Sequence, residues 1–414
     1  MPIYRLLLSI LFVPILIMLL GRVLARKERF GELLARFGLG PVTSVKKDAS
    51  LWLHAASNGE LTSAKPVLEK LRQSKTKNFI LITCNTLSGV QLATSMGFRA
   101  RLAPMDYGWA IRTFCRNEGI VEHITMESEI WPNRIAILHK KRIAIVVLGA
   151  RLSVRTMKTW SKFPQLASAT VGKVNFLSAQ DSESLHRFKN FDLALIAVGP
   201  IVNLKSFVEQ PNDIPPRSER ANICLAASTH PGEDEIILDG FCQVRAEWPA
   251  LKLILTPRHP NRAEDIKTLL SERDLSFVCK SQSNAVAPAE YDVLLADTLG
   301  DMNLWYYQSS ICIIGGSFKH SGGHTPYEPA AYECALIHGP FTDNFKAEYE
   351  TLTSNRASLV AKSAQDVFKN LQSLKNVAAQ EHLAKSARDA LAQNDNLDTL
   401  MQDVTSALRS TRSL

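Results

Sequence analysis

The sequence has no closely spaced pair of cysteines. Its seven cysteines are scattered, their number is odd, and no two of them form a C-x-x-C pattern. This distribution argues against a disulfide framework and against a structural zinc site. Several cysteines fall in apolar, strand-like runs, as Cys312 does in ICIIGG. We therefore expect reduced, buried thiols in a protein whose soluble part is cytosolic.

Motifs for nucleic-acid binding are also missing. The chain has no zinc-finger spacing, no basic zipper and no basic stripe interleaved with aromatic residues. Its formal net charge of +8 and pI of about 9.1 instead favour phosphate-bearing substrates or an acidic membrane face. The histidines show no metal-ligand spacing, so no metal is expected. With 46% apolar and 21% charged residues, the chain is predicted to fold.

The N-terminus lacks charge over a long apolar run, Leu6 to Leu20. Counted from Pro2, the run reaches the roughly 20 residues that a bilayer crossing needs. No small-x-small cleavage site is evident before Gly21, which argues against a signal peptide. The basic residues that follow it place the rest of the chain on the cytoplasmic side: Arg22, Arg26, Lys27 and Arg29. Residues 1–25 are predicted to be a membrane anchor, with a helix lying in the membrane interface as the alternative.

The rest of the chain contains two successive series of β–α units and no internal repeat. Alternation of apolar runs with helical segments predicts parallel sheets covered on both faces, hence an α/β fold. Residues 26–208 are expected to form the first doubly wound domain and 221–414 the second, including the terminal helices. A polar, proline-rich stretch, 209–220, is the predicted linker. Open α/β folds bind ligands at the carboxyl ends of their strands.

The first candidate site is the segment HAASNGE, which ends at Glu60 and follows the first strand of the soluble part. A carboxylate on a strand-to-helix loop beside Gly59 suits a general base. Ser57 and Glu60 also have the spacing of a capping box, and spacing alone does not separate the two interpretations. Because a helix N-terminus favours the ionised carboxylate, a base here needs its pKa raised by burial or by a neighbouring acid. Glu127 and Glu129, at the end of another strand, are the candidate neighbours.

In the second half, five strand-end loops are suited to a nucleotide. Ser228 to Glu233 starts a helix, whose N-terminus favours an anion. Arg258 can form paired hydrogen bonds to a phosphate. The glycine pair before Ser317 is expected to offer backbone N–H groups to phosphate. Thr325 is predicted to cap a helix in a second capping box with Glu328, which can instead hold a ribose diol. The fifth loop contains Asp301 and Met302. None of these loops is a P-loop or a dinucleotide-binding fingerprint.

The order of these motifs resembles that of the 3-deoxy-D-manno-octulosonic acid (Kdo) transferases. The matching segments are HAASNGE, MESEIWPN, GARLS, NLK, STHPGE, PRHP, DTLGDM, GGS and GGHTPYEPA, from about Arg26 to about Phe345. The resemblance implies a two-domain GT-B fold with an N-terminal anchor in the inner membrane. It also implies inverting transfer of Kdo from CMP-Kdo to a lipid A precursor in lipopolysaccharide synthesis, generally without a metal.

The resemblance also assigns roles to residues. Glu60 would be the general base, presented by the loop that contains Ser57 and Gly59, and Glu127 or Glu129 would be the second essential acid. The remaining residues would contact the substrates. Arg258, Gly315, Gly316 and Ser317 would face the CMP phosphate and cytosine, Asp301 and Met302 the base, Glu328 the ribose, and Arg151 and Lys205 the acidic groups of donor or acceptor.

Two residues depart from the pattern of the family. Asn58 stands where a small aliphatic residue is usual, and Thr325 stands where asparagine is usual, which removes one amide donor. Neither change removes an ionisable group, so we expect an active enzyme. The alternatives are a GT-B lipid glycosyltransferase that uses a UDP-sugar and a catalytically inactive membrane protein that binds sugar nucleotides.

Overall fold

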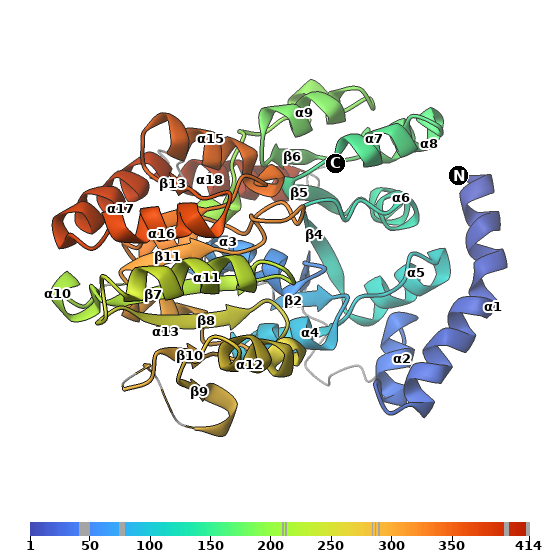
Figure 1. Ribbon diagram of the computed structural model, residues 1–414. Coiled ribbons are helices and arrows are strands. Elements are labelled where there is room, and N and C mark those ends of the chain that lie inside the picture. The colour runs from blue at the N-terminus through green and yellow to red at the C-terminus, as the bar shows by residue number, and fades with distance from the viewer. Residues whose placement is uncertain are drawn as a thin grey trace. The chain divides into compact units, whose positions relative to one another are not determined.

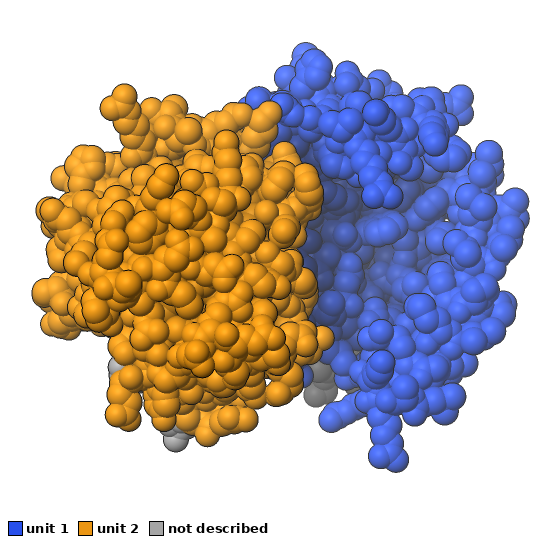
Figure 2. All heavy atoms as spheres, viewed as in Figure 1, with its two compact units in different colours: residues 1–207, 394–414 blue, residues 208–393 orange. Residues whose placement is uncertain are grey.

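The computed structural model describes residues 1–40, 50–73, 79–208, 211, 213–283, 285, 287–288, 290–392 and 397–410. The chain forms two compact units, which Figure 2 shows in different colours. Unit 1 comprises Met1–Phe207 and Asn394–Leu414, and unit 2 comprises Val208–Gln393. Each unit is built on its own parallel sheet (Figure 1).

Unit 1 contains a six-stranded parallel sheet in the order β3-β2-β1-β4-β5-β6. Its strands are β1 (Ser50–His54), β2 (Phe79–Cys84), β3 (Arg99–Leu102), β4 (Ile120–Met126), β5 (Ala144–Ala150) and β6 (Phe176–Ala179). Successive residues of a strand point to opposite faces, so Trp52 belongs to one apolar core and Leu51 and Leu53 to the other. A sheet with a core on each face explains why its strands are nearly continuous apolar runs.

Helices cover both faces of this sheet, and a further helix, α1, lies at the N-terminus of the chain. They are α1 (Pro2–Leu24), α2 (Phe30–Arg36), α3 (Asn58–Gln73), α4 (Leu87–Ser95), α5 (Gly108–Asn117), α6 (Pro132–Lys140), α7 (Val154–Trp160), α8 (Pro164–Val171) and α9 (Ser182–Lys189). By length and composition alone, α1 is able to cross a membrane. The apolar run LALIAVG, residues 193–199, has the composition of a strand but contains the 3-10 turn Leu195–Ala197.

Unit 2 contains a seven-stranded parallel sheet in the order β13-β12-β11-β7-β8-β10-β9. Its strands are β7 (Ile223–Thr229), β8 (Lys252–Pro257), β9 (Phe277–Cys279), β10 (Val293–Leu295), β11 (Ile311–Ile314), β12 (Ala335–His338) and β13 (Leu359–Val360). Its helices are α10 (Arg217–Arg220), α11 (Asp234–Arg245), α12 (Ala263–Ser271), α13 (Met302–Gln308), α14 (Tyr327–Ala331), α15 (Lys346–Ser354), α16 (Ala364–Ser373) and α17 (Val377–Leu391). All seven cysteines of the chain are free, and six of them are buried.

The C-terminal helix corrects the predicted division of the chain. Helix α18 (Leu397–Ser410) belongs to unit 1, not to the second domain, because it packs against α3 and β5. It supplies four buried apolar side chains to a core of unit 1: Leu400, Met401, Val404 and Leu408. An amphipathic helix carries no sequence signal for which of two sheets it will cover, so only the packing decides the assignment.

The predicted linker, 209–220, is also shorter than expected. Residues 209, 210 and 212 of this stretch lie outside the described residues. Its last four residues form α10 and belong to unit 2, because the buried Arg220 donates hydrogen bonds to the carbonyl oxygens of Ser309 at 2.7 Å and Tyr332 at 2.8 Å.

Each sheet has a central switch point, from which successive parts of the chain build the sheet outward in opposite directions. In unit 1 this switch point lies between β1 and β4, and in unit 2 it lies between β7 and β11. Loops that leave the carboxyl ends of the two central strands diverge there and leave a crevice, the usual ligand site of an open α/β sheet. The loop with Glu60 follows β1, and the loop with Glu127 and Glu129 follows β4.

Candidate active site

Glu60 lies in the first turn of α3, directly after the loop that leaves β1. Its Oε2 accepts a hydrogen bond from the Ala56 N–H at 2.8 Å, and its own N–H donates to the Ser57 hydroxyl at 3.3 Å. The capping role and the catalytic role are therefore compatible, because capping occupies only one carboxylate oxygen. The Asn58 side chain is exposed and accepts a 3.3 Å hydrogen bond from Ser88 on α4.

Glu60 has the electrostatics that a base at a helix start requires. Burial is the main cause that raises its pKa from the ordinary value to about 7. The hydrogen bond from Ala56 opposes this shift, and the negative charges of Glu127 and Glu129 add to it. A carboxylate with a pKa near neutrality accepts a proton far more readily than an ordinary glutamate and is still half ionised at neutral pH.

Glu129 is held as a carboxylate by two ring N–H groups. Its Oε2 lies 3.2 Å from His54 Nε2 and accepts a 2.6 Å hydrogen bond from Trp131 Nε1. Burial opposes its ionisation, but these hydrogen bonds and the charge interaction with His54 outweigh burial and hold the pKa of Glu129 at about 2. Burial lowers the pKa of His54 to about 4, so its ring is neutral and donates from Nε2 to the Glu129 carboxylate. Its Nδ1 lies 2.9 Å from the Thr83 hydroxyl and 3.1 Å from the Thr83 carbonyl oxygen.

Glu127 occupies a backbone conformation that is rare outside glycine, with φ +47°. Its N–H donates to the Leu148 carbonyl at 2.9 Å, and its Oε1 pairs with Lys205 Nζ at 3.0 Å. The neighbouring Ser128 hydroxyl donates to the backbone carbonyl of Arg151 at 2.7 Å. Strained backbone concentrates at functional sites. The structure thus brings Glu60, Glu127, Glu129, Lys205 and Arg151 to one edge of the unit 1 sheet.

In unit 2, the buried carboxylate of Glu233 joins the loops that leave β7 and β11. Its Oε2 accepts from the N–H groups of His230 at 2.8 Å and Gly316 at 2.7 Å, and its Oε1 accepts from Phe318 N–H at 2.8 Å. This corrects two predictions. The glycine loop does not leave the Gly316 N–H open for phosphate, and the N-terminus of α11 already contains a negative group, Glu233, as its N-cap residue.

Gly315 and Ser317 help to pack the end of β11 and the loop that follows it against neighbouring parts of unit 2. A Cβ on Gly315 would lie 2.6 Å from the Ser228 carbonyl oxygen, so only glycine allows β7 and β11 to approach here. The Gly315 N–H donates to Ala227 O at 2.8 Å. The Ser317 hydroxyl is fully buried, donates to Ile314 O and accepts from Gly339 N–H. The Ser317 hydroxyl and the N–H groups of Gly315 and Gly316 already have partners in the protein. They are therefore not available for the ligand contacts that were predicted for this loop.

Two histidines and an arginine meet beside the glycine loop. The Nε2 atoms of His230 and His324 lie 3.0 Å apart, so one ring donates to the other. Burial lowers the pKa of His230 and brings that of His324 to about 4. Arg258 is exposed, its charge contributes to lowering both pKa values, and its N–H donates to Thr229 O at 2.9 Å. These side chains offer an exposed cation and neutral ring nitrogens to an anionic ligand.

The last loops follow β10 and β11. Asp301 is the N-cap residue of α13 and accepts from the Thr298 hydroxyl at 3.1 Å, while Met302 packs partly against the core. Helix α14 begins at Tyr327, one residue later than predicted, so Pro326 is its N-cap. Thr325 still contributes, because its Oγ1 accepts from Tyr327 N–H at 3.3 Å.

Glu328 is a half-buried carboxylate in the first turn of α14. Burial alone raises its pKa. Within the described part of the chain, no hydrogen bond or ion pair reaches its carboxylate, in contrast to Glu233. A carboxylate that solvent can still reach remains able to accept hydrogen bonds from a ligand. The second capping box predicted here therefore does not form, and the ribose-binding role of Glu328 stays a prediction.

Sequence reasoning missed the partners that organise these acids. His54 and Trp131 were quoted within motifs without a role, as were His230, Glu233 and His324. Their positions in the sequence could have identified them as site residues, since each lies at a strand end or in the loop that follows. Among the residues that the structure describes, no group of three or more metal-ligating side chains is found.

Comparisons with known proteins agree with this architecture. Residues 27–208 match the model of the 3-deoxy-D-manno-octulosonic-acid transferase (kdotransferase) family. The 3-deoxy-D-manno-octulosonic acid transferase of Haemophilus influenzae is 28% identical over 396 residues, 92% of each chain. A probable mitochondrial 3-deoxy-D-manno-octulosonic acid transferase of Arabidopsis thaliana is 29% identical over 77% of this chain and 74% of its own length.

A solved structure shows the same fold. The glycosyltransferase from Rickettsia africae superimposes with a TM-score of 0.58 at 12% identity, over 89% of this chain and 99% of that chain. Together with the family match and the relatives at 28–29% identity, the two doubly wound sheets identify the fold and the family. The chain is a glycosyltransferase with the GT-B fold and belongs to the 3-deoxy-D-manno-octulosonic acid transferase family.

Proposed function

We propose that this enzyme transfers Kdo from CMP-Kdo to a sugar hydroxyl of a lipid A precursor, with Glu60 as the general base. The observation that carries the proposal is the half-buried Glu60 carboxylate, with a pKa of about 7, at the switch point of the unit 1 sheet. Chain-wide similarity to Kdo transferases supports Kdo as the transferred sugar. The net charge of +8 suits a phosphorylated, membrane-embedded acceptor.

In the proposed reaction, Glu60 takes the proton of the acceptor hydroxyl. The acceptor oxygen forms a bond to the anomeric carbon of Kdo while the bond between that carbon and the CMP phosphate oxygen breaks, which inverts the configuration. Glu129 stays ionised, because His54 and Trp131 hydrogen-bond to it. It therefore keeps a fixed negative charge that raises the affinity of Glu60 for the proton.

Unit 2 is the proposed donor site. Arg258, with the rings of His230 and His324 beside it, would stabilise the negative charge that develops on the CMP leaving group. Glu328, whose carboxylate has no hydrogen-bond partner among the residues that the structure describes, would accept hydrogen bonds from the ribose hydroxyls. Asp301 and Met302 would lie near the cytosine. Lys205 and Arg151 in unit 1 would contact acidic groups of the substrates.

The direct test is a mass spectrum of the lipid product. Purified enzyme, CMP-Kdo and a lipid IVA-like acceptor should give CMP and an acceptor heavier by whole Kdo units. Absence of both products would refute the proposal. CMP should also raise the thermal midpoint of the enzyme more than UDP does at equal concentration, whereas the reverse order would favour a UDP-sugar donor.

The pH dependence of turnover should follow Glu60. The base must be ionised, and a pKa of about 7 means that the carboxylate is mostly protonated below that pH. We therefore expect kcat/KM to rise about tenfold per pH unit up to about pH 7 and then to level off. Glu127→Gln removes a like charge and should shift this acid limb to lower pH. A profile that is flat through neutrality would contradict the assignment.

Glu328→Ala should lower the affinity for CMP about ten- to a hundredfold, since each hydrogen bond to a charged group contributes about 1.5–3 kcal/mol. Calorimetric titration with CMP and with 2′-deoxy-CMP measures the effect. The wild-type protein should prefer CMP, and the variant should bind both nucleotides alike. Glu350→Ala, on an exposed face of α15, is the matched control. A variant that keeps the preference for CMP would show that Glu328 does not bind the ribose.

A further inference from the structure

One face of α1 packs against the body of unit 1 along the length of the helix. Leu19 is buried in a core cluster with Leu33 and Phe37 of the α2 region and with Tyr107 and Ala110 of the α5 region. Further side chains of α1 pack partly against this cluster: Leu8, Phe12, Ile15, Leu16 and Val23. Their spacing of three and four residues defines one stripe of the helix. Figure 1 shows α1 running beside α5, from the N-terminus to α2.

The N-terminal end of α1 is fixed to unit 1 by polar contacts. The Tyr4 hydroxyl donates to Asp106 Oδ2 at 2.8 Å, and Arg5 Nε donates to Asn133 Oδ1 at 3.0 Å. Asp106 and Asn133 are themselves buried and bonded to each other, because the Asn133 N–H donates to Asp106 Oδ2. The Tyr107 hydroxyl adds a 3.1 Å hydrogen bond to the Leu8 carbonyl.

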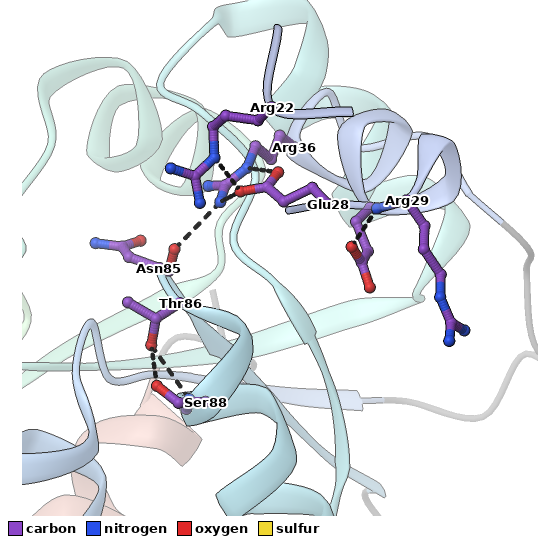
Figure 3. A network of polar contacts seen from close by, with 9 residues as sticks. Arg22, Glu28, Arg29, Arg36, Asn85, Thr86 and Ser88 are labelled. Carbon is purple, nitrogen blue, oxygen red and sulfur yellow. Dashed lines mark hydrogen bonds and ion pairs between the residues drawn. The ribbon is translucent and has the colours of Figure 1, made fainter. Parts of the chain in front are cut away.

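The C-terminal end of α1 is fixed to the same unit. Arg22 Nε donates to the buried carboxylate of Glu28 at 2.7 Å, and Arg36 donates to both oxygens of that carboxylate (Figure 3). Arg36 also reaches the Asn85 carbonyl in the loop after β2 at 3.4 Å. Both ends of α1 therefore contact the same globular unit.

The opposite face of α1 is apolar and exposed. It carries ten large side chains that are at least 40% exposed: Ile3, Leu6, Leu7, Ile10, Leu11, Val13, Ile17, Met18, Leu20 and Leu24. Phe30 and Trp109, on the neighbouring helices, are exposed as well. A contiguous apolar surface of this size marks an interaction site, and a helix that is apolar all round needs a second apolar environment.

Cationic side chains border this apolar face. The exposed residues Arg26, Lys27 and Arg29 follow the helix. At the other end, a groove of about 440 Å³ between α1 and α5 is lined by Arg5 and Arg112 together with Tyr107 and Trp109. Arginine and tryptophan near an apolar surface are typical of the level of lipid head groups. The charge pattern therefore fits a bilayer with anionic head groups.

We propose that α1 does not cross the membrane but lies in the plane of the interface, with the face from Ile3 to Leu24 inserted among the acyl chains of the cytoplasmic leaflet. A crossing helix would separate its ends by the roughly 30 Å of the hydrocarbon core. Residues 4 and 22 would then lie on opposite sides, whereas in the structure both contact unit 1. This proposal rests on the membrane anchor predicted from the sequence and is independent of the reaction.

Cysteine labelling in membranes tests the orientation of α1. Pro2→Cys and Lys27→Cys are made in a Cys242→Ser background, since the other native cysteines are buried. An impermeant maleimide should label both positions in inverted inner-membrane vesicles and neither in spheroplasts. Labelling of Pro2→Cys in spheroplasts would show a crossing helix. Failure to label it from either side would place residue 2 in the hydrocarbon, which also overturns the proposal.

A second experiment tests the inserted face. Ile10→Asp with Ile17→Asp should lower binding to vesicles of phosphatidylethanolamine and phosphatidylglycerol about a hundredfold, because each change removes an apolar side chain from the bilayer. Val377→Asp, on an exposed apolar position of unit 2, should change nothing. If the double variant still binds vesicles, the proposal is wrong. It is also wrong if the double variant loses vesicle binding and a dimer of the protein dissociates at the same time.

Turnover separates failure of this proposal from failure of the proposed function. With a water-soluble, deacylated acceptor, the Ile10 and Ile17 double variant should release CMP at the wild-type rate, since neither residue contacts the sites in units 1 and 2. Loss of vesicle binding with retained turnover supports the in-plane helix. Absence of turnover in both proteins would count against the proposed reaction and leave the vesicle result valid.

Discussion

Glu60→Gln should reduce kcat about a thousandfold or more while leaving the Kd for CMP within about twofold of the wild-type value. The amide has almost the shape of the carboxylate and still accepts the Ala56 N–H hydrogen bond, so the helix cap persists. It cannot take a proton from the acceptor hydroxyl, and general bases contribute about 10²–10⁴ in rate. Single-turnover release of CMP from CMP-Kdo measures the loss.

The control for Glu60 lies on the same helix. Glu69 pairs with Lys65 on the exposed face of α3, with 55% of its side chain exposed, so Glu69→Gln should retain wild-type turnover. The thermal midpoints of both variants should match that of the wild type. Turnover by Glu60→Gln within tenfold of wild type would assign the base elsewhere, with Glu127 as the first residue to examine.

Glu233→Ala should have the largest effect on the stability of unit 2. It would leave three buried N–H groups, those of His230, Gly316 and Phe318, without an acceptor. Each unsatisfied buried group costs about 1–3 kcal/mol, so the loss of three acceptor contacts should lower the free energy of unfolding by about 3–9 kcal/mol. Urea unfolding followed by fluorescence measures the change. Because these N–H groups fix the loops after β7 and β11, CMP affinity should fall at least tenfold as well.

Glu233→Gln is the conservative companion to this variant. The amide keeps one acceptor oxygen and turns an NH₂ group toward at least one of the three N–H donors, so we expect an intermediate loss of stability. Glu264→Ala, with 83% of its side chain exposed on α12, is the control and should leave both stability and CMP binding unchanged. Wild-type CMP affinity in a folded Glu233→Gln protein would mean that this carboxylate does not organise the nucleotide loops.

The central strands and the edge strand β6 could be predicted from the sequence, but the edge strands β3, β9 and β13 could not. β1, β4, β5, β7, β8 and β11 are buried on both faces, which leaves continuous apolar runs. β3, with the sequence RARL, is only partly buried, and its arginines pair with Glu118 of the neighbouring segment. β9 and β13 have three and two residues. Strands this short are defined by their neighbours more than by their own residues.

The loops of the candidate site were predictable because the carboxyl ends of parallel strands meet at one edge. The need for a raised pKa at Glu60 also followed from its place at a helix start, and burial is the main cause that provides it. What a sequence cannot show is which donors are already occupied. Gly315 and Gly316 look like a phosphate loop, yet the first packs against the chain at Ser228 and the second donates to Glu233.

The place of α18 has a consequence for synthesis of the chain. A core of unit 1 includes Leu400, Met401, Val404 and Leu408, so the first unit to leave the ribosome is the last whose core can be completed. Burial of each such side chain contributes about 1.5–3 kcal/mol. Until residue 408 has emerged, that apolar surface of α3 and β5 remains uncovered and open to chaperones or to aggregation. For the same reason, a fragment ending at Phe207 would be an unfavourable choice for expression, although it contains all six strands of its sheet.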